Sequence, residues 1–229
     1  MVLSRARGEG QSEALLPSIA RRVKQAIASG ELAPGAKLSP SSMAAGLGVS
    51  HIPVREALAS LAAFGYIEHR PRVGFFVHHR SADDLDDILH WREILEDEAL
   101  RMAIPRLTDG DIAHLRQLCD EVRELATPDH RSRHHDYLAL DRRFHFVVFR
   151  RAGSERLVRF LSYLWDLAAP YICAGPDICA GPGGDRPGGH DLAADHERLV
   201  DLFGARDVAG AIKAMAQHRE ASRANACIG

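Results

Sequence analysis

Apolar positions in the first third of the chain follow a helical period and then give way to a β-type pattern. Apolar side chains recur every three or four residues over residues 12–29, which predicts an amphipathic helix. Two shorter helical patterns follow, one ending near residue 47 and one spanning about residues 50–64. The stretches YIEH and GFFVHH are rich in β-forming residues and flank a short turn, so they predict a hairpin. Three helices and a hairpin predict a winged helix-turn-helix domain over residues 12–78.

From residue 83 onward the pattern is helical almost throughout, which predicts an all-helical bundle over residues 83–225. The expected helices lie near residues 83–104, 108–126, 131–152, 154–171, 190–204 and 207–225. Thr108 and Ser154 stand where N-caps are expected. Residues 172–189 repeat ICAGP and are rich in Gly and Pro, so they predict a long loop, either a functional lid or an insertion, of which we favour the insertion. The predicted fold class is mainly α.

Charge is divided unequally between the two predicted domains. Residues 1–80 carry a formal charge of +5 and the remainder carries −7, although the whole chain has only −2. A basic N-terminal part favours a polyanionic partner such as DNA for that part alone. No apolar run resembles a signal peptide or spans a membrane, and the four cysteines form no Cys-x-x-Cys pair. We therefore expect a reduced, cytoplasmic protein without a membrane partner.

The third predicted helix separates an apolar face from a polar one. His51 and Arg55 lie opposite its apolar face near its N-terminus, the end of a recognition helix that reaches base edges in DNA. The arginines of the predicted hairpin tip suit the DNA backbone or the minor groove. An ordinary helical subdomain with solvated arginines would show the same pattern. The candidate DNA-binding residues are Ser50, His51, Arg55, Arg70, Arg72 and Gly74.

Three predicted helices of the second domain each turn a histidine toward an apolar face. Asp141 and His145 share such a face because they are four residues apart, and His196 and His218 lie on apolar stripes of the last two helices. A single inward histidine is more often a satisfied core residue than a metal ligand. Four buried polar side chains need partners, however, and one divalent cation would satisfy all of them. Zinc suits this donor set best, and nickel, manganese or iron are alternatives.

Arg92 also falls on an apolar stripe, on the first helix of this domain. Two interpretations stay open. Arg92 could form a surface ion pair with Glu96 one turn later. Alternatively, Arg92 and Glu96 belong to an effector site, in which the Arg92 guanidinium could bind the carboxylate of a small effector, for which its fork is well shaped. Phe144 lies between two of the candidate metal ligands in sequence and is expected to face away from them.

Two stretches of the N-terminal part, SGELAPGAKL and LGVSHIPVREALASLAAFGYIEHRPRVGFFV, resemble the DNA-binding domain of the GntR superfamily of bacterial transcription regulators. Arg55 matches a DNA-contacting position of that family. His51 stands where the family usually has an arginine, and Pro40-Ser41 replace a usual Glu-Arg pair. The resemblance implies a winged helix that binds double-stranded DNA at a palindromic operator.

The C-terminal part resembles the FCD ligand-binding domain of FadR-type members of the same superfamily. The similarity rests on WREILEDEA, on Asp141-x-x-Phe144-His145, and on His196 and His218. In metal-containing members these positions supply the four ligands, so the resemblance implies a metal site here. It also implies a homodimer that senses a small carboxylate, and repression more often than activation.

Two other functions compete with this one. A metal-dependent enzyme acting on small carboxylates is one, but no further inward acid or base stands out to move protons, so we expect no enzyme. A metal-free regulator that senses an acyl ligand is the other, and the intact Asp and His set disfavours it.

Overall fold

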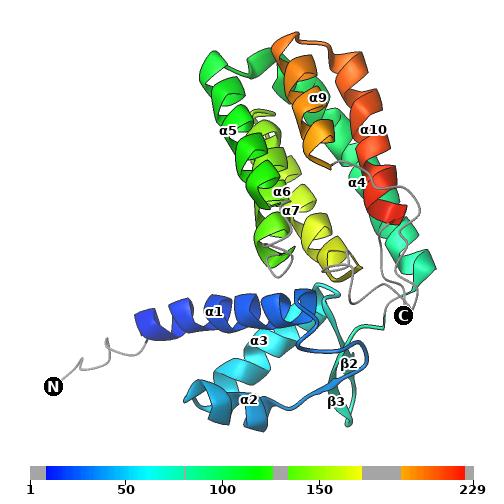
Figure 1. Ribbon diagram of the computed structural model, residues 1–229. Coiled ribbons are helices and arrows are strands. Elements are labelled where there is room, and N and C mark those ends of the chain that lie inside the picture. The colour runs from blue at the N-terminus through cyan, green and yellow to red at the C-terminus, as the bar shows by residue number, and fades with distance from the viewer. Residues whose placement is uncertain (1–8, 80, 126–133, 172–191, 225–229) are drawn as a thin grey trace, which may run out of the picture. The chain divides into compact units, whose positions relative to one another are not determined.

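The structure is a computed structural model that describes residues 9–79, 81–125, 134–171 and 192–224 (Figure 1). The chain divides into two compact units, Met1–Ser81 and Ala82–Gly229. The first unit combines helices with a small sheet and the second is built from helices, which confirms the predicted fold class. Within the described residues, no helix has the length and apolar character needed to cross a membrane.

The first unit is a winged helix-turn-helix. Its elements in chain order are α1 (Glu9–Ala28), β1 (Lys37–Leu38), α2 (Pro40–Leu47), α3 (His51–Ala63), β2 (Ile67–Arg70) and β3 (Gly74–Val77). The predicted hairpin is present as β2 and β3, but it belongs to an antiparallel sheet with the order β1-β3-β2. The sequence pattern did not predict β1, because two residues are too few to show alternation. Its existence rests on pairing with Phe75 and Phe76 of β3.

The core of this unit lies between α1, α3 and the sheet. Its buried apolar side chains include Ile19, Val23, Ile27, Leu38, Val54, Leu58, Leu61, Ile67, Phe75 and Val77. Gly48 ends α2 with a φ of 67°, a left-handed conformation that favours glycine. Ser50 occupies the N-cap position of α3, although its side chain makes no capping hydrogen bond. The apolar face of α3 is thus turned to the core and its polar face outward.

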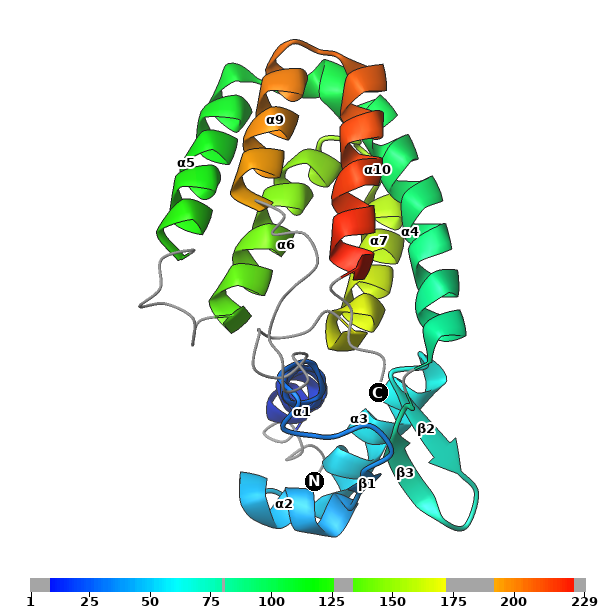
Figure 2. The same cartoon turned by 45° about the vertical axis from the view of Figure 1, so that its right-hand side comes forward.

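The second unit is a bundle of helices that lie side by side, as Figures 1 and 2 show from two directions. Its elements are α4 (Ala82–Ala103), η1 (Ile104–Arg106), α5 (Asp109–Leu125), α6 (His134–Arg150), α7 (Glu155–Ala168), η3 (Ala169–Tyr171), α9 (Leu192–Gly204) and α10 (Val208–Ala224). Each predicted helix of this part is present, and the predicted ends at residues 131, 190 and 225 lie outside the described residues. The predicted loop over residues 172–189 lies outside the described residues.

The helix α6 packs against α4, α5 and α7. Phe144 and Phe149 on α6 are fully buried, in keeping with a helix that is apolar over most of its circumference. The predicted N-caps are also present. The Thr108 hydroxyl accepts a hydrogen bond from the backbone N–H of Asp111, and the Ser154 hydroxyl accepts one from that of Leu157. These helices fix the positions from which polar side chains enter the interior.

Candidate functional site

Asp141 and three histidines meet inside the helical bundle. Asp141 and His145 come from α6, His196 from the first half of α9, and His218 from the second half of α10. Each of the four residues is buried, with at most 8% of its surface exposed. One potential ligand atom from each lies within 4.8 Å of the others. The structure therefore brings together the four residues that the sequence selects as candidate metal ligands.

The carboxylate of Asp141 is the centre of this cluster. Its Oδ1 atom lies 3.2 Å from Nε2 of His196, 3.5 Å from Nε2 of His145 and 3.7 Å from Nε2 of His218. Among the described residues, Asp141 Oδ1 and both ring nitrogens of His196 are buried without a hydrogen-bond partner. Such atoms are costly in a protein interior. Imidazole and carboxylate are preferred donors for zinc and related ions, so a divalent cation fits these residues.

The ionisation of the cluster follows from burial and mutual contact. Burial raises the pKa of Asp141, but the three histidines outweigh this effect and hold that pKa well below its usual range. Burial lowers the pKa of His145 to about 4. Burial also lowers the pKa of His218, yet the nearby carboxylates of Asp141 and Asp195 outweigh it and raise the pKa to about 9. At neutral pH the Asp141 carboxylate and the His145 ring are therefore in the unprotonated forms that bind metal.

Aromatic rings surround the imidazoles. The ring centroid of Phe144 lies 4.3 Å from that of His196, and the Trp165 ring lies 5.2 Å from that of His145. Phe144 was expected to face away from Asp141 and His145, its neighbours on α6, and its contact with His196 was not predicted. Spacing along α6 places Phe144 away from Asp141 and His145, but it cannot show a ring that enters from α9. These rings keep the cluster in an apolar setting.

A second buried cluster of polar groups lies beside the first. The carboxylate of Glu96 accepts hydrogen bonds from Nε of Arg92 at 3.0 Å, Nε1 of Trp165 at 2.7 Å and Nη1 of Arg219 at 3.2 Å. The Arg92 guanidinium also lies 4.1 Å from the centroid of the Trp165 ring, whose other neighbours include His145. Burial raises the pKa of Glu96, but the positive charges of Arg92 and Arg219 outweigh this effect and lower the pKa below its usual value. Glu96 is therefore a carboxylate.

Arg92 therefore points inward, as its place on an apolar stripe indicates, and its ion pair with Glu96 is buried rather than at the surface. The reason is that Trp165 and Arg219 cover it from α7 and α10. The sequence reasoning did not select Arg219, because a single arginine near the end of a helix is usually solvated. Its position directly after His218 gives no sign of this contact, because consecutive residues on a helix point about 100° apart.

The candidate recognition residues lie at the start of α3. Ser50, His51 and Arg55 are all exposed there. No carboxylate pairs with Arg55 in the part of the chain that the structure describes. Ile52, which was not selected from the sequence, is 58% exposed beside them. An exposed apolar side chain at this end of a recognition helix can contact a thymine methyl group.

The two arginines of the wing differ in their surroundings. Arg70 lies on β2, and Glu68 accepts hydrogen bonds from its Nε at 2.9 Å and its Nη2 at 2.8 Å. Its guanidinium also lies 4.5 Å from the ring centroid of Phe76. Arg72 is exposed in the turn between β2 and β3. Arg72 is therefore the arginine of the wing that is available to a partner, whereas Arg70 is held by Glu68.

Gly74 begins β3 with a φ of 127°, which favours glycine. A side chain there would contact the aliphatic part of Lys37, an exposed residue of β1 that was missed along with this strand. Among the described residues, no carboxylate pairs with Lys37. The wing surface thus combines Lys37, Arg72 and the open backbone at Gly74.

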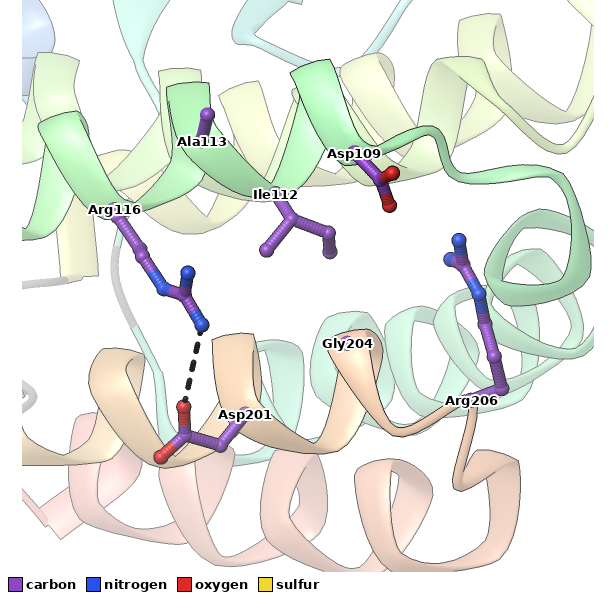
Figure 3. A pocket seen from close by; sticks show the side chains of 7 residues that line it. All are labelled: Asp109, Ile112, Ala113, Arg116, Asp201, Gly204 and Arg206. Carbon is purple, nitrogen blue, oxygen red and sulfur yellow. Dashed lines mark ion pairs between the residues drawn. The ribbon is translucent and has the colours of Figure 1, made fainter.

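A pocket of about 380 Å³ lies between α5 and α9 and includes none of the candidate residues (Figure 3). It is lined by Asp109, Ile112, Ala113, Arg116, Asp201, Gly204 and Arg206. Three of its four charged side chains already have partners: the Arg206 guanidinium donates to the carbonyls of Ile104 and Leu107, and Arg116 lies 4.0 Å from Asp201. We assign no ligand to this pocket.

Comparisons with known proteins point to one group. The FCD domain model matches residues 87–221, and the model for bacterial regulatory proteins of the gntR family matches residues 16–77. The chain is 34% identical over 129 residues to the Nta operon transcriptional regulator of Aminobacter aminovorans, covering 55% of this chain and 58% of that protein. It is 29% identical over 224 residues to the putative L-lactate dehydrogenase operon regulatory protein of Escherichia coli, covering 89% and 83%.

The structure of Escherichia coli McbR/YncC has the same fold, with a TM-score of 0.76 and 24% identity over 90% of this chain and 94% of that one. The matched proteins are named as regulators rather than enzymes. Fold and matches together define the class as transcription regulators of the GntR type. The chain belongs to the GntR family of bacterial regulatory proteins, in the group that carries an FCD domain.

Proposed function

We propose that the protein binds a palindromic operator as a homodimer and that a small organic acid, bound at a metal centre in the FCD domain, controls its affinity for that DNA. The observation that carries this proposal is the buried cluster of Asp141, His145, His196 and His218 with its unsatisfied donor atoms. Zinc is the ion that suits the donor set best, with nickel, manganese or iron as alternatives. The ion would supply positive charge and coordination positions for the oxygen atoms of the acid.

The neighbouring arginines favour an anionic effector. Arg92 and Arg219 are buried beside the cluster, and Glu96 accepts hydrogen bonds from both. A carboxylate that enters from the metal side would share or replace Glu96 at the Arg92 guanidinium. The name of the Escherichia coli relative refers to an L-lactate dehydrogenase operon. Lactate is a small hydroxy acid, which supports this class of effector.

On the DNA side, His51 and Arg55 would contact base edges in the major groove, with Ser50 at the helix start. Arg72 and Gly74 would contact the DNA backbone or the minor groove. Arg70 would contact DNA only while its guanidinium also binds Glu68.

Binding of the acid would change how the two DNA-binding domains of the dimer are held, and thereby their fit to half-sites one turn apart. Repression relieved by the acid is the outcome we propose.

Fluorescence anisotropy with DNA from the region upstream of the chain's own gene tests this function. Zinc-loaded protein should bind that DNA, and one member of a panel of small hydroxy and dicarboxylic acids should weaken binding by about tenfold or more. His196→Ala should still bind the DNA but lose the response to the acid, whereas the exposed Asp201→Ala should respond like the wild type. An equal response in His196→Ala would refute control through the metal centre.

A further inference from the structure

Asp195 and His196 are neighbours on α9, but their side chains contact different residues. His196 contributes its Nε2 atom to the candidate metal cluster, 3.2 Å from Asp141 Oδ1. The Asp195 side chain instead reaches α10, where its Oδ2 atom lies 3.4 Å from Nδ1 of His218. The opposite nitrogen of that ring, Nε2, lies 3.2 Å from Nε2 of His145. The His218 ring is therefore held with Asp195 at one edge and the cluster at the other.

This arrangement matters because an imidazole binds a metal ion through one nitrogen and keeps a hydrogen on the other. A carboxylate that accepts the Nδ1 hydrogen fixes the tautomer in which Nε2 carries the lone pair. It also fixes the rotation of the ring and makes Nε2 a stronger donor. Asp195 contacts the His218 nitrogen opposite the one that faces His145, and it does not belong to the group of residues that could hold an ion.

We propose that Asp195 is a positioning residue that orients His218 for metal binding, an inference that rests on the metal centre proposed above. His196 differs from His218 in this respect, because its Nδ1 atom has no hydrogen-bond partner among the described residues. His218 is the ligand contributed by the last helix of the bundle. A fixed ring at this position would allow the α10 ligand to meet those of α6 and α9 without rearrangement.

The test is a titration of metal-free protein with Zn²⁺ alone, in competition with a chromophoric chelator. Asp195→Ala should raise the dissociation constant for Zn²⁺ by about 10- to 100-fold, the range found when such partners of metal ligands are removed. Asp195→Asn keeps an acceptor for the Nδ1 hydrogen, so its affinity for Zn²⁺ should fall by less than that of Asp195→Ala. Asp201→Asn removes an exposed acid from the same helix and should bind Zn²⁺ like the wild type.

Two further measurements distinguish the orientation of the His218 ring from an effect of net charge. At saturating Co²⁺, Asp195→Ala should change the visible absorption bands of the bound ion, because one ligand is no longer fixed, while Asp201→Asn should not. The loss of Zn²⁺ affinity should also persist at about 0.5 M NaCl, where an effect of net charge alone is largely screened. Disappearance of the loss in high salt, or unchanged Co²⁺ bands, would overturn the orienting role.

Failure of this inference is distinguishable from failure of the metal centre. If Asp141→Ala abolishes Zn²⁺ binding while Asp195→Ala binds Zn²⁺ within about twofold of the wild type, the centre stands and the positioning role is wrong. If Asp141→Ala binds Zn²⁺ as tightly as the wild type, the centre itself is wrong. Should Asp195→Ala fail to fold, the Asp195→Leu variant decides, since it has a similar size but no acceptor, and unchanged Zn²⁺ affinity and unchanged Co²⁺ bands in that variant contradict the proposal.

Discussion

The Oδ1 atom of Asp141 on α6 lies 3.2 Å from Nε2 of His196 on α9, and neither atom has a hydrogen-bond partner among the described residues. Because a divalent cation would use both atoms as ligands, we expect purified protein to hold about one such ion per chain. Asp141→Ala and His196→Ala should lose it, as measured by metal analysis after dialysis. Wild-type protein should also melt at a higher temperature with Zn²⁺ than with a chelator, because the ion binds the folded state.

The control for this experiment is His114→Ala, which removes an exposed histidine of α5. It should retain both the metal ion and the Zn²⁺-dependent gain in melting temperature. Metal content that is unchanged in Asp141→Ala and His196→Ala would show that the ion, if any, binds elsewhere.

A second prediction concerns Arg55, which is exposed at the start of α3 and has no carboxylate partner in the described part of the chain. Replacement by alanine should weaken specific DNA binding by about 1–3 kcal/mol, the usual contribution of one arginine that contacts a base edge. Metal content should not change. Arg116→Ala removes a solvated arginine of the second unit and should bind DNA normally. Equal DNA affinity of Arg55→Ala and wild type would refute the recognition-helix assignment.

Much of the fold could be predicted from the sequence, because apolar residues that recur every three or four positions indicate helices. The strand β1 was not, since Lys37 and Leu38 alone carry no period and pair with β3 only after the chain has folded. The ion pair of Arg92 and Glu96, for which the sequence left a surface and an inward position open, illustrates the same limit. Spacing on α4 correctly placed them in contact, but their burial depends on Trp165 and Arg219 from other helices.

The four candidate ligands were accessible for a different reason. Each is a polar residue on an apolar face of its own helix, where an apolar residue is expected. One bound metal ion would account for all four polar residues. Asp195 and Arg219 carry no such signal, because they sit next to His196 and His218 at positions where a charged residue is ordinary. Residues that contact the candidate ligands from outside the cluster could therefore be identified only from the structure.

Asp111 provides a prediction on pH dependence. Burial raises its pKa, but hydrogen bonds from Arg151 and Thr108 outweigh this and lower it from 3.8 to about 2. Because the folded pKa is depressed, the stabilisation is present above about pH 4 and is lost as the pH falls toward 2. Asp111→Asn should therefore lower the free energy of unfolding by about 1–2 kcal/mol at neutral pH, and by less as the pH drops below 4.

Urea denaturation of the wild type and Asp111→Asn between about pH 7 and pH 3 measures this difference. Asp109→Asn removes an exposed acid from the same first turn of α5 and should cost less at neutral pH. A deficit of Asp111→Asn that stays constant down to pH 3 would contradict the ionic origin of the effect.

Gly46 inside α2 and Gly48 just after it allow backbone conformation to be tested apart from packing. A Cβ atom added at Gly46 or at Gly48 would meet no atom within 4 Å, but only Gly48 has a positive φ, of 67°. Gly46→Ala should raise the free energy of unfolding by about 0.5 kcal/mol, because alanine loses less entropy in a helix. Gly48→Ala should lower it by about 1 kcal/mol, because alanine is strained in the left-handed region. Urea denaturation of both variants measures the two changes, and changes of the same sign would mean that φ is not the deciding factor.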